Sequence, residues 1–252
     1  MISQEALDFY KKNKDLKWRM YPIPENLTTD IEKANWILNE AEFGWIELDL
    51  SIDLAGWQLE AGQCRDYFVA HRENSSHGWR SCCIHGIGID KTGAWTNYGY
   101  TDEADVPYRW TDLAYRAPQV TNFWRNNFPA VDYRRIRFMD IIPGGSINPH
   151  SDRPGNLPGE ENFDALTFGV PVNIAVLHPE SCHMVLEGFG TVPFQEGQAF
   201  IINIRHRHSV INFSNKHRVH VIGHSKGYGK RLEDFASLVV RSYQKQYEHY
   251  KV

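Results

Sequence analysis

The sequence predicts a mainly β fold, either a β-sandwich or a jelly roll, flanked by helices at both ends of the chain. Six short apolar segments follow one another in the second half, separated by glycine, proline, asparagine and serine: residues 134–142, 167–177, 183–189, 197–203, 209–213 and 217–224. Many short strands with turn residues between them are typical of these two architectures. A chain of 252 residues can bury roughly three quarters of its unfolded surface, so such a core needs no disulfides.

The first part of the chain combines helical and strand-like patterns. The stretch to about Asn39 reads as helical, and Thr29 and Glu32 have the spacing of a capping box. Residues 44–50 and 78–89 are aromatic or apolar segments bounded by glycine or polar residues, which favours strands.

Two further helical regions follow. Residues 109–131 predict a helix that breaks around Pro118 and a second short helix over residues 121–128. Near the C-terminus, one helical stripe of apolar residues predicts a helix that covers the barrel: Leu232, Phe235, Leu238, Val239 and Tyr243.

The sequence contains no internal repeat and no low-complexity segment. We therefore expect one domain over residues 1–252, with a jelly-roll core of about 65–225. Helical elements at about 1–45 and 230–250 are expected to flank this core.

Composition limits the partners and the compartment. The formal net charge of −4 argues against nucleic acid or an anionic membrane, because phosphate binding needs clustered positive charge. The cysteines show no CxxC spacing, and Cys82 and Cys83 are adjacent, which favours a reducing compartment. No apolar run reaches the roughly 18 residues of a membrane span. We expect a soluble, cytoplasmic protein.

The segment "NPHSDRPG" contains a candidate pair of metal ligands. His150 and Asp152 occupy alternate positions, so in an extended segment both side chains point to the same face. An imidazole and a carboxylate suit iron(II), for which one more ligand completes a facial triad. A turn with an adjacent surface histidine explains the same residues equally well.

A third ligand and an anion-binding residue are available further along the chain. His206 and His208 share a face in "NIRHRHSV", and Arg218 follows His208 by ten residues on the next predicted strand. An inward-pointing arginine is always charged and can hold a carboxylate through two parallel hydrogen bonds. An exposed edge strand, with Arg218 and His220 in solvent, is the alternative.

Three motifs together resemble the iron(II)/2-oxoglutarate dioxygenases, and within them the aspartyl/asparaginyl β-hydroxylase-like branch. They are "HGWRSCCIHG", "PGGSINPHSD" and "PFQEGQAFIIN…HSVINFSNKHRVHV", and the resemblance covers roughly residues 78–224. It implies a double-stranded β-helix (jelly roll) that uses Fe(II), 2-oxoglutarate and O₂ and releases succinate and CO₂. His150, Asp152 and His208 match the family's metal-ligating, catalytic residues. Arg218 matches the residue that binds the distal carboxylate of 2-oxoglutarate, and the ten-residue spacing favours His208 over His206.

The sequence departs from the mammalian members of this branch at two places. Those enzymes have glycine where this chain has Asp152. They also carry an Arg-x-His pair for the cosubstrate, and we align Pro171 and Asn173 with that pair. The resemblance therefore implies a cosubstrate pocket built around Arg218, with Asn173 as a candidate polar contact, and it does not transfer a substrate.

The expected reaction is hydroxylation of an unactivated C–H bond in a free amino acid or another small polar metabolite. A peptidyl Asp, Asn or Pro residue is the second choice of substrate. Two different classes of protein compete with this reading of the residues: a cupin-like module that binds a metal or a small acid without turnover, and a zinc hydrolase. The sequence predicts no oligomeric state.

Several other residues receive weaker predictions. His71, His77, His178 and His249 lie among polar residues, which is typical of solvated surface histidines. The polar loop 153–164 follows the candidate ligands and is a candidate substrate-contacting segment, with Arg153, Glu160 and Glu161 as its charged residues.

Overall fold

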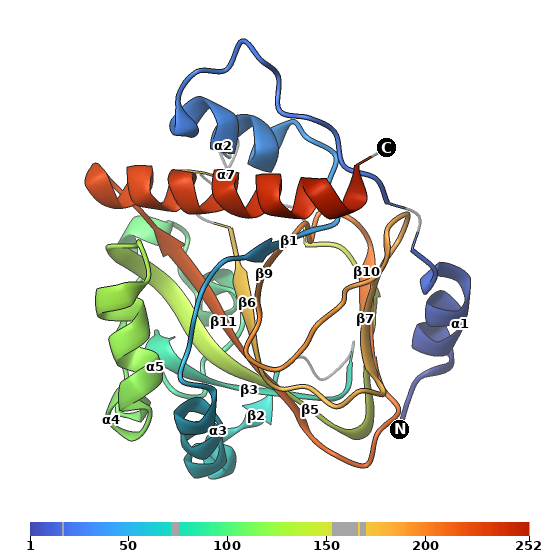
Figure 1. Cartoon of the computed structure of the whole chain (residues 1–252). Coiled ribbons are helices and arrows are strands. Elements are labelled where there is room, and N and C mark those ends of the chain that lie inside the picture. The colour runs from blue at the N-terminus through green and yellow to red at the C-terminus, as the bar shows by residue number, and fades with distance from the viewer. Residues whose placement is uncertain (17, 72–75, 153–165, 167–169, 252) are drawn as a thin grey trace.

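A long central strand, β5 (Asp132–His150), organises the molecule. In the computed structural model, which describes residues 1–16, 18–71, 76–152, 166 and 170–251, β5 pairs with three other strands, β3, β10 and β11. The described strands form one sheet of eleven, and every pairing between them is antiparallel. The sheet curls into a half-barrel with helices around it (Figure 1).

The two halves of the curled sheet meet at β5. The first half has the order β9-β6-β11-β5, and the second half continues from β5 to β10, β7 and β8. The bounds of these strands are β6 Val172–Leu177, β7 Cys182–Leu186, β8 Gly190–Thr191, β9 Ala199–Ile202, β10 His208–Asn212 and β11 Arg218–Lys226. This order is that of a double-stranded β-helix, so the predicted jelly roll is confirmed.

A kink at Pro143-Gly144-Gly145 allows β5 to pair with strands of both halves of the sheet. Residues 132–141 of β5 pair with β11, whereas residues 146–150 pair with β10. Between them, Gly144 has a φ of +66°, which is unfavourable for other residues. A Cβ on Gly145 would lie 2.7 Å from the carbonyl oxygen of His77 on β3. These two glycines therefore allow the strand to turn toward the second half while β3 stays close.

The remaining strands extend the sheet. β1 (Trp45–Leu48) pairs with β9 at one edge, so the sheet starts before residue 65. β3 (Ser76–Gly86) lies along β5 and also pairs with β2 (Val69–Ala70) and β4 (Arg109–Trp110). The two strand segments expected in the first half of the chain are therefore present.

Helices cover the outside of the sheet. Their bounds are α1 Gln4–Asn13, α2 Asp30–Asn39, α3 Leu54–Gln63, α4 Leu113–Arg116, α5 Pro118–Asn122 and α7 Lys230–Tyr250, with a π-helical turn at Phe123–Asn127 and short 3₁₀ turns at Arg65–Tyr67, Trp95–Tyr98 and Glu103–Asp105. The predicted capping box is present, because Thr29 and Glu32 satisfy each other's backbone N–H groups. No described helix has both the length and the apolar character that crossing a membrane requires.

The broken helix near Pro118 starts earlier than predicted. α4 ends at Arg116, and α5 begins at Pro118 itself rather than at residue 121. Proline fits the first position of a helix because its missing N–H would have no partner there. The carboxylate of Glu60 accepts the next two N–H groups, from Gln119 at 2.7 Å and Val120 at 3.0 Å.

The C-terminal helix seals an edge of the sheet, as predicted for a covering helix. It lies across β1 beside α2 (Figure 1), and its apolar stripe is buried except for the half-buried Leu232. Gln246 accepts a hydrogen bond from the N–H of Glu47 and donates one to the carbonyl of Trp45. These contacts protect part of an edge strand that would otherwise be open to pairing with other chains.

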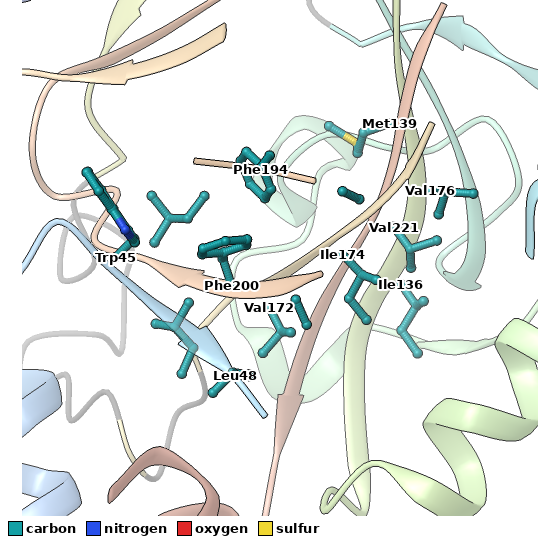
Figure 2. Packing of buried hydrophobic residues seen from close by; sticks show 14 of the residues in the cluster. Trp45, Leu48, Ile136, Met139, Val172, Ile174, Val176, Phe194, Phe200 and Val221 are labelled. Atoms are coloured by element: carbon teal, nitrogen blue, oxygen red, sulfur yellow. The ribbon is translucent and has the colours of Figure 1, made fainter. Parts of the chain in front are cut away.

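The interior of the first half is apolar. Side chains from β1, β5, β6, β9 and β11 take part in the cluster, and Figure 2 shows Phe200 of β9 beside Phe194, which lies in the segment before β9. The buried polar residues described below are therefore set in a core of low dielectric, where unpaired charge is costly.

Candidate metal and cosubstrate site

His150, Asp152 and His208 come together at the end of β5. One ligand atom from each lies within 4.8 Å of the others, and no other described histidine, cysteine or acid belongs to such a group of three. His150 ends β5 and His208 starts β10, and the two residues are partners in the strand register. The placement of His150 and Asp152 thus agrees with the expectation that their side chains share a face. The pairing of β10 with β5 brings His208 to the same place.

Backbone carbonyls orient both histidines. Nδ1 of His150 lies 2.8 Å from the carbonyl oxygen of Asn148, and Nδ1 of His208 lies 3.0 Å from that of His206. Each carbonyl fixes the proton on Nδ1 and leaves Nε2 with a lone pair, as in metal-binding histidines. The two rings have centroids 4.4 Å apart. The donor set is therefore prepared for a cation.

Asp152 is held by its own backbone. Its N–H donates to the carbonyl of Ile204 at 3.0 Å, which ties the residue after β5 to the turn before β10. One carboxylate oxygen lies 3.9 Å from Nε2 of His150. Two imidazole nitrogens and a carboxylate oxygen are the donors of a facial triad for iron(II), with positions open for other ligands.

His206 lies apart from this group. It belongs to the turn before β10, where its N–H donates to the carbonyl of Asn203. Its ring packs on Phe189 with a centroid distance of 4.5 Å. The pairing of His206 with His208, which a zinc hydrolase would need, is not formed among the described residues.

Arg218 is a buried cation, and no described carboxylate is close enough to be its counter-ion. It starts β11 and is 2% exposed. Its Nε has no hydrogen-bond partner, and no carboxylate of the described chain lies within salt-bridge distance of its guanidinium. Burial lowers its pKa to about 10. A buried charge of this kind is costly unless an anion joins it. The residue therefore fits a ligand with a carboxylate, such as 2-oxoglutarate.

Asn173 lies on the neighbouring strand β6 and is buried. Its side-chain oxygen lies 2.6 Å from Nδ1 of His220. The residue expected to contact the cosubstrate therefore bonds His220, and it has no hydrogen bond to Arg218 among the described contacts.

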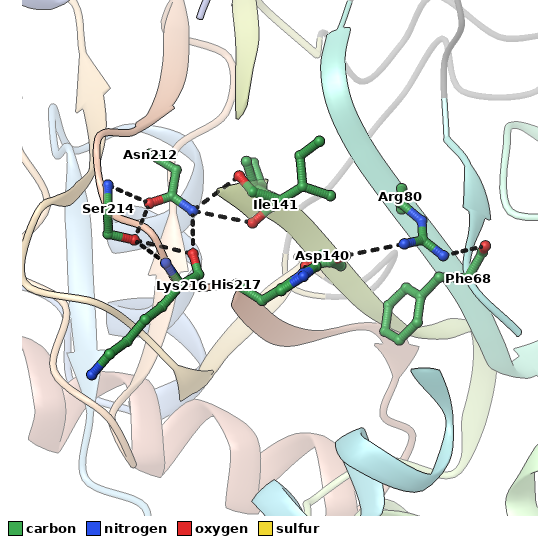
Figure 3. A network of polar contacts seen from close by, with 9 residues as sticks. Phe68, Arg80, Asp140, Ile141, Asn212, Ser214, Lys216 and His217 are labelled. Atoms are coloured by element: carbon green, nitrogen blue, oxygen red, sulfur yellow. Dashed lines mark hydrogen bonds and ion pairs between the residues drawn. The ribbon is translucent and has the colours of Figure 1, made fainter. Parts of the chain in front are cut away.

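Asn212 holds the turn that precedes Arg218, and the sequence reasoning missed it. This fully buried residue ends β10 and donates to the carbonyls of Ile141, Ile142 and Lys216 at 2.8–3.2 Å (Figure 3). Its side-chain oxygen accepts from Ser214. It thus fixes the turn that leads into β11. The available signal was an asparagine at a strand end before the turn residues Phe213 to Lys216.

A second polar group stabilises the same turn from the outer face of the sheet. The buried carboxylate of Asp140 lies 2.9 Å from Nδ1 of His217 and 4.0 Å from Arg80 (Figure 3). Burial raises the pKa of Asp140 despite these partners. His217 directly precedes Arg218, so this pair helps to hold the start of β11.

For two of the four histidines predicted to lie in solvent, His178 and His71, the prediction is wrong. His178 is half-buried, with Nδ1 2.9 Å from Nε2 of His220. His71 packs on Trp79, and its Nδ1 lies 2.8 Å from the hydroxyl of Ser81. Local polar sequence misled the prediction, because the following strand β3 covers the ring of His71 and the distant strand β11 brings His220 against that of His178. His77 and His249 are exposed as predicted. The loop 153–164 lies outside the described residues.

One class of protein, the iron(II)/2-oxoglutarate-dependent oxygenases, combines a double-stranded β-helix with a His-x-Asp…His cluster and a buried arginine that binds an anion. Residues 53–224, more than half of the chain, match the family model of aspartyl/asparaginyl beta-hydroxylase. The chain belongs to this family and is an oxygenase of the hydroxylase type.

Solved structures show more distant likenesses. A prolyl-4-hydroxylase from Pseudomonas putida is 15% identical, with 80% of this chain and 100% of that chain covered and a TM-score of 0.42. A 2OG-Fe(II) oxygenase family oxidoreductase from Burkholderia pseudomallei is 14% identical, with 82% and 93% covered and a TM-score of 0.46. At these scores neither likeness bears on the substrate. A search of curated proteins returned no match.

Proposed function

We propose that the protein hydroxylates an unactivated C–H bond of a small polar metabolite, using iron held by His150, Asp152 and His208. Arg218 is proposed to bind the distal carboxylate of 2-oxoglutarate. The observation that carries the proposal is Arg218 itself, a buried cation with no paired carboxylate among the described residues, in the same barrel as three converging metal ligands. A metal-binding module without turnover has no need for this charge.

The residues of the chain have separate tasks in this reaction. When bound, iron(II), 2-oxoglutarate and O₂ supply the oxidant for C–H hydroxylation, with succinate and CO₂ as coproducts. His150 and His208 present unprotonated Nε2 atoms because backbone carbonyls hold their Nδ1 protons. Arg218 fixes the far end of the cosubstrate through its guanidinium fork. The apolar wall around it excludes water and strengthens that contact.

We propose a free amino acid or another small polar metabolite as the substrate. The support is that the described helices pack around one sheet, and no second folded unit for holding a polypeptide is present among the described residues. A peptidyl Asp, Asn or Pro residue is the competing substrate.

The experiment is a screen for substrate-stimulated succinate formation. Purified protein with Fe(II), 2-oxoglutarate and O₂ is given free amino acids in one set and short peptides in the other, with Asp152→Ala as the inactive control. We expect stimulation by members of the first set. Stimulation by peptides alone would contradict the substrate proposal, and failure to bind 2-oxoglutarate at all would contradict the cosubstrate site.

A further inference from the structure

Two buried polar side chains and the half-buried His178 form a hydrogen-bonded row inside the barrel. The side-chain oxygen of Asn173 lies 2.6 Å from Nδ1 of His220, and Nε2 of His220 lies 2.9 Å from Nδ1 of His178. His220 is 0% exposed, and both of its ring nitrogens are engaged. We refer to Asn173, His220 and His178 as the imidazole row.

The imidazole row lies beside Arg218. His220 follows Arg218 by two residues on β11, so both side chains point to the same face of the strand. Arg218 acts electrostatically on both histidines of the row, and Cys182 on β7 acts on Arg218. Phe194 packs against both rings, with centroids 4.6 Å from His220 and 5.3 Å from His178.

The row is uncharged at neutral pH. Burial and the neighbouring Arg218 lower the pKa of His178 to about 3 and that of His220 well below its ordinary value. Burial raises the pKa of the Cys182 thiol to about 11, so it too stays neutral.

Three other titratable groups act on the row or on Arg218: Glu196, His183 and Asp140. Glu196 accepts a hydrogen bond from the backbone N–H of His178. His183 acts on His178, and burial lowers its pKa as well. Asp140 acts on Arg218 from the outer face of the sheet, where it pairs with His217. None of these groups contacts the His220 ring in the described contacts.

We propose that His220 is a positioning residue for cosubstrate binding. Clamped in an uncharged state by Asn173 and His178, it walls the pocket beside Arg218 and leaves that guanidinium as the one positive charge of this wall. The inference rests on the proposed cosubstrate site. It adds that the affinity for 2-oxoglutarate depends on the neutrality of the imidazole row, in addition to the charge of Arg218.

Asn173→Asp tests this dependence with almost no change in shape. At low pH the new carboxyl group and His220 hold one shared proton, so the pair stays neutral overall, as in the wild type. When the pH rises, the pair loses that proton and a negative charge remains beside Arg218. This charge competes with the distal carboxylate, so the affinity for 2-oxoglutarate must fall as the pH rises.

The measurement is calorimetric titration of 2-oxoglutarate into protein saturated with Mn(II), which replaces iron and prevents turnover. Asn203→Asp is the matched control, since Asn203 is also 6% exposed but bonds Arg205 and Phe43 away from the imidazole row. We expect the ratio of variant to wild-type Kd to rise about tenfold or more between about pH 6 and about pH 8.5 for Asn173→Asp. For Asn203→Asp we expect a constant ratio.

A second measurement needs no change of charge. The His220 signals in ¹⁵N-histidine spectra of the Zn(II)-loaded protein are assigned by their loss in His220→Asn. They should keep the chemical shifts of a neutral imidazole down to about pH 5.5, and they should shift when 2-oxoglutarate is added. A His220 that titrates near its ordinary pKa overturns the proposal, as does a constant Kd ratio for a folded Asn173→Asp variant. Wild-type protein that does not bind 2-oxoglutarate refutes the cosubstrate site instead.

Discussion

Replacing Arg218 by methionine should make the free protein more stable and the cosubstrate complex much weaker. Methionine retains the length and apolar contacts of the side chain and removes the charge. The guanidinium is 2% exposed and has no carboxylate partner among the described residues. Its removal therefore leaves no other buried charge unpaired in the free protein.

The two effects have opposite signs and can be given a size. Burial lowers the pKa of Arg218 to about 10, a displacement that corresponds to about 3 kcal/mol of cost for the buried charge. Part of this should return as a higher free energy of unfolding in Arg218→Met. In the complex, the distal carboxylate loses its partner, which costs about 3–5 kcal/mol, or roughly two to four decades in Kd. Arg218→Lys should recover only part of the affinity, because an ammonium group cannot form the bidentate fork.

The assay combines urea unfolding of the metal-free protein with a 2-oxoglutarate titration at saturating metal. Arg205→Met is the control, because Arg205 is hydrogen-bonded to Asn203 and Leu38; it should lose stability and keep its affinity for 2-oxoglutarate. Metal binding should survive in both variants. An unchanged affinity in Arg218→Met would refute the role of Arg218, and a large loss of stability without 2-oxoglutarate would show that a carboxylate of the chain already pairs with it.

Three further outcomes are expected. Asp152→Ala and His208→Ala should each abolish Fe(II) binding and succinate formation, whereas His206→Ala should retain both; loss in His206→Ala alone would reverse the assignment. Burial lowers the pKa of His85 to about 4. As the pH falls, this histidine is therefore protonated in the unfolded chain at a higher pH than in the folded protein. Stability should drop by about 2 kcal/mol between pH 7 and about pH 5 from this residue, and a His85→Asn variant with an unchanged pH profile would contradict this. Thr29→Ala removes the capping box and should cost about 1 kcal/mol in thermal or urea unfolding; an unchanged free energy of unfolding would contradict this.

Local patterns in the sequence were enough to place several elements. The capping box at Thr29 needs only residues of the same turn, and it is present as predicted. The alternation of His150 and Asp152 puts them on one face, because successive side chains of an extended chain point to opposite sides. The turn residues between the short strands of the second half were sufficient to predict a β-sandwich or a jelly roll, and the family resemblance selected the jelly roll.

The tertiary structure decided which of these faces meet. His206 and His208 share a face in the sequence, where only the spacing to Arg218 favours His208; the register of β10 with β5 places His208 opposite His150. His178 lies in a polar segment and yet is half-buried, because β11 brings His220 against it from 42 residues away. Asn173 is likewise hydrogen-bonded to His220, which is 47 residues away in the sequence. Side-chain alternation is a property of neighbouring residues and can be seen in the sequence, whereas strand pairing depends on contacts between segments far apart in the chain, which no local pattern encodes.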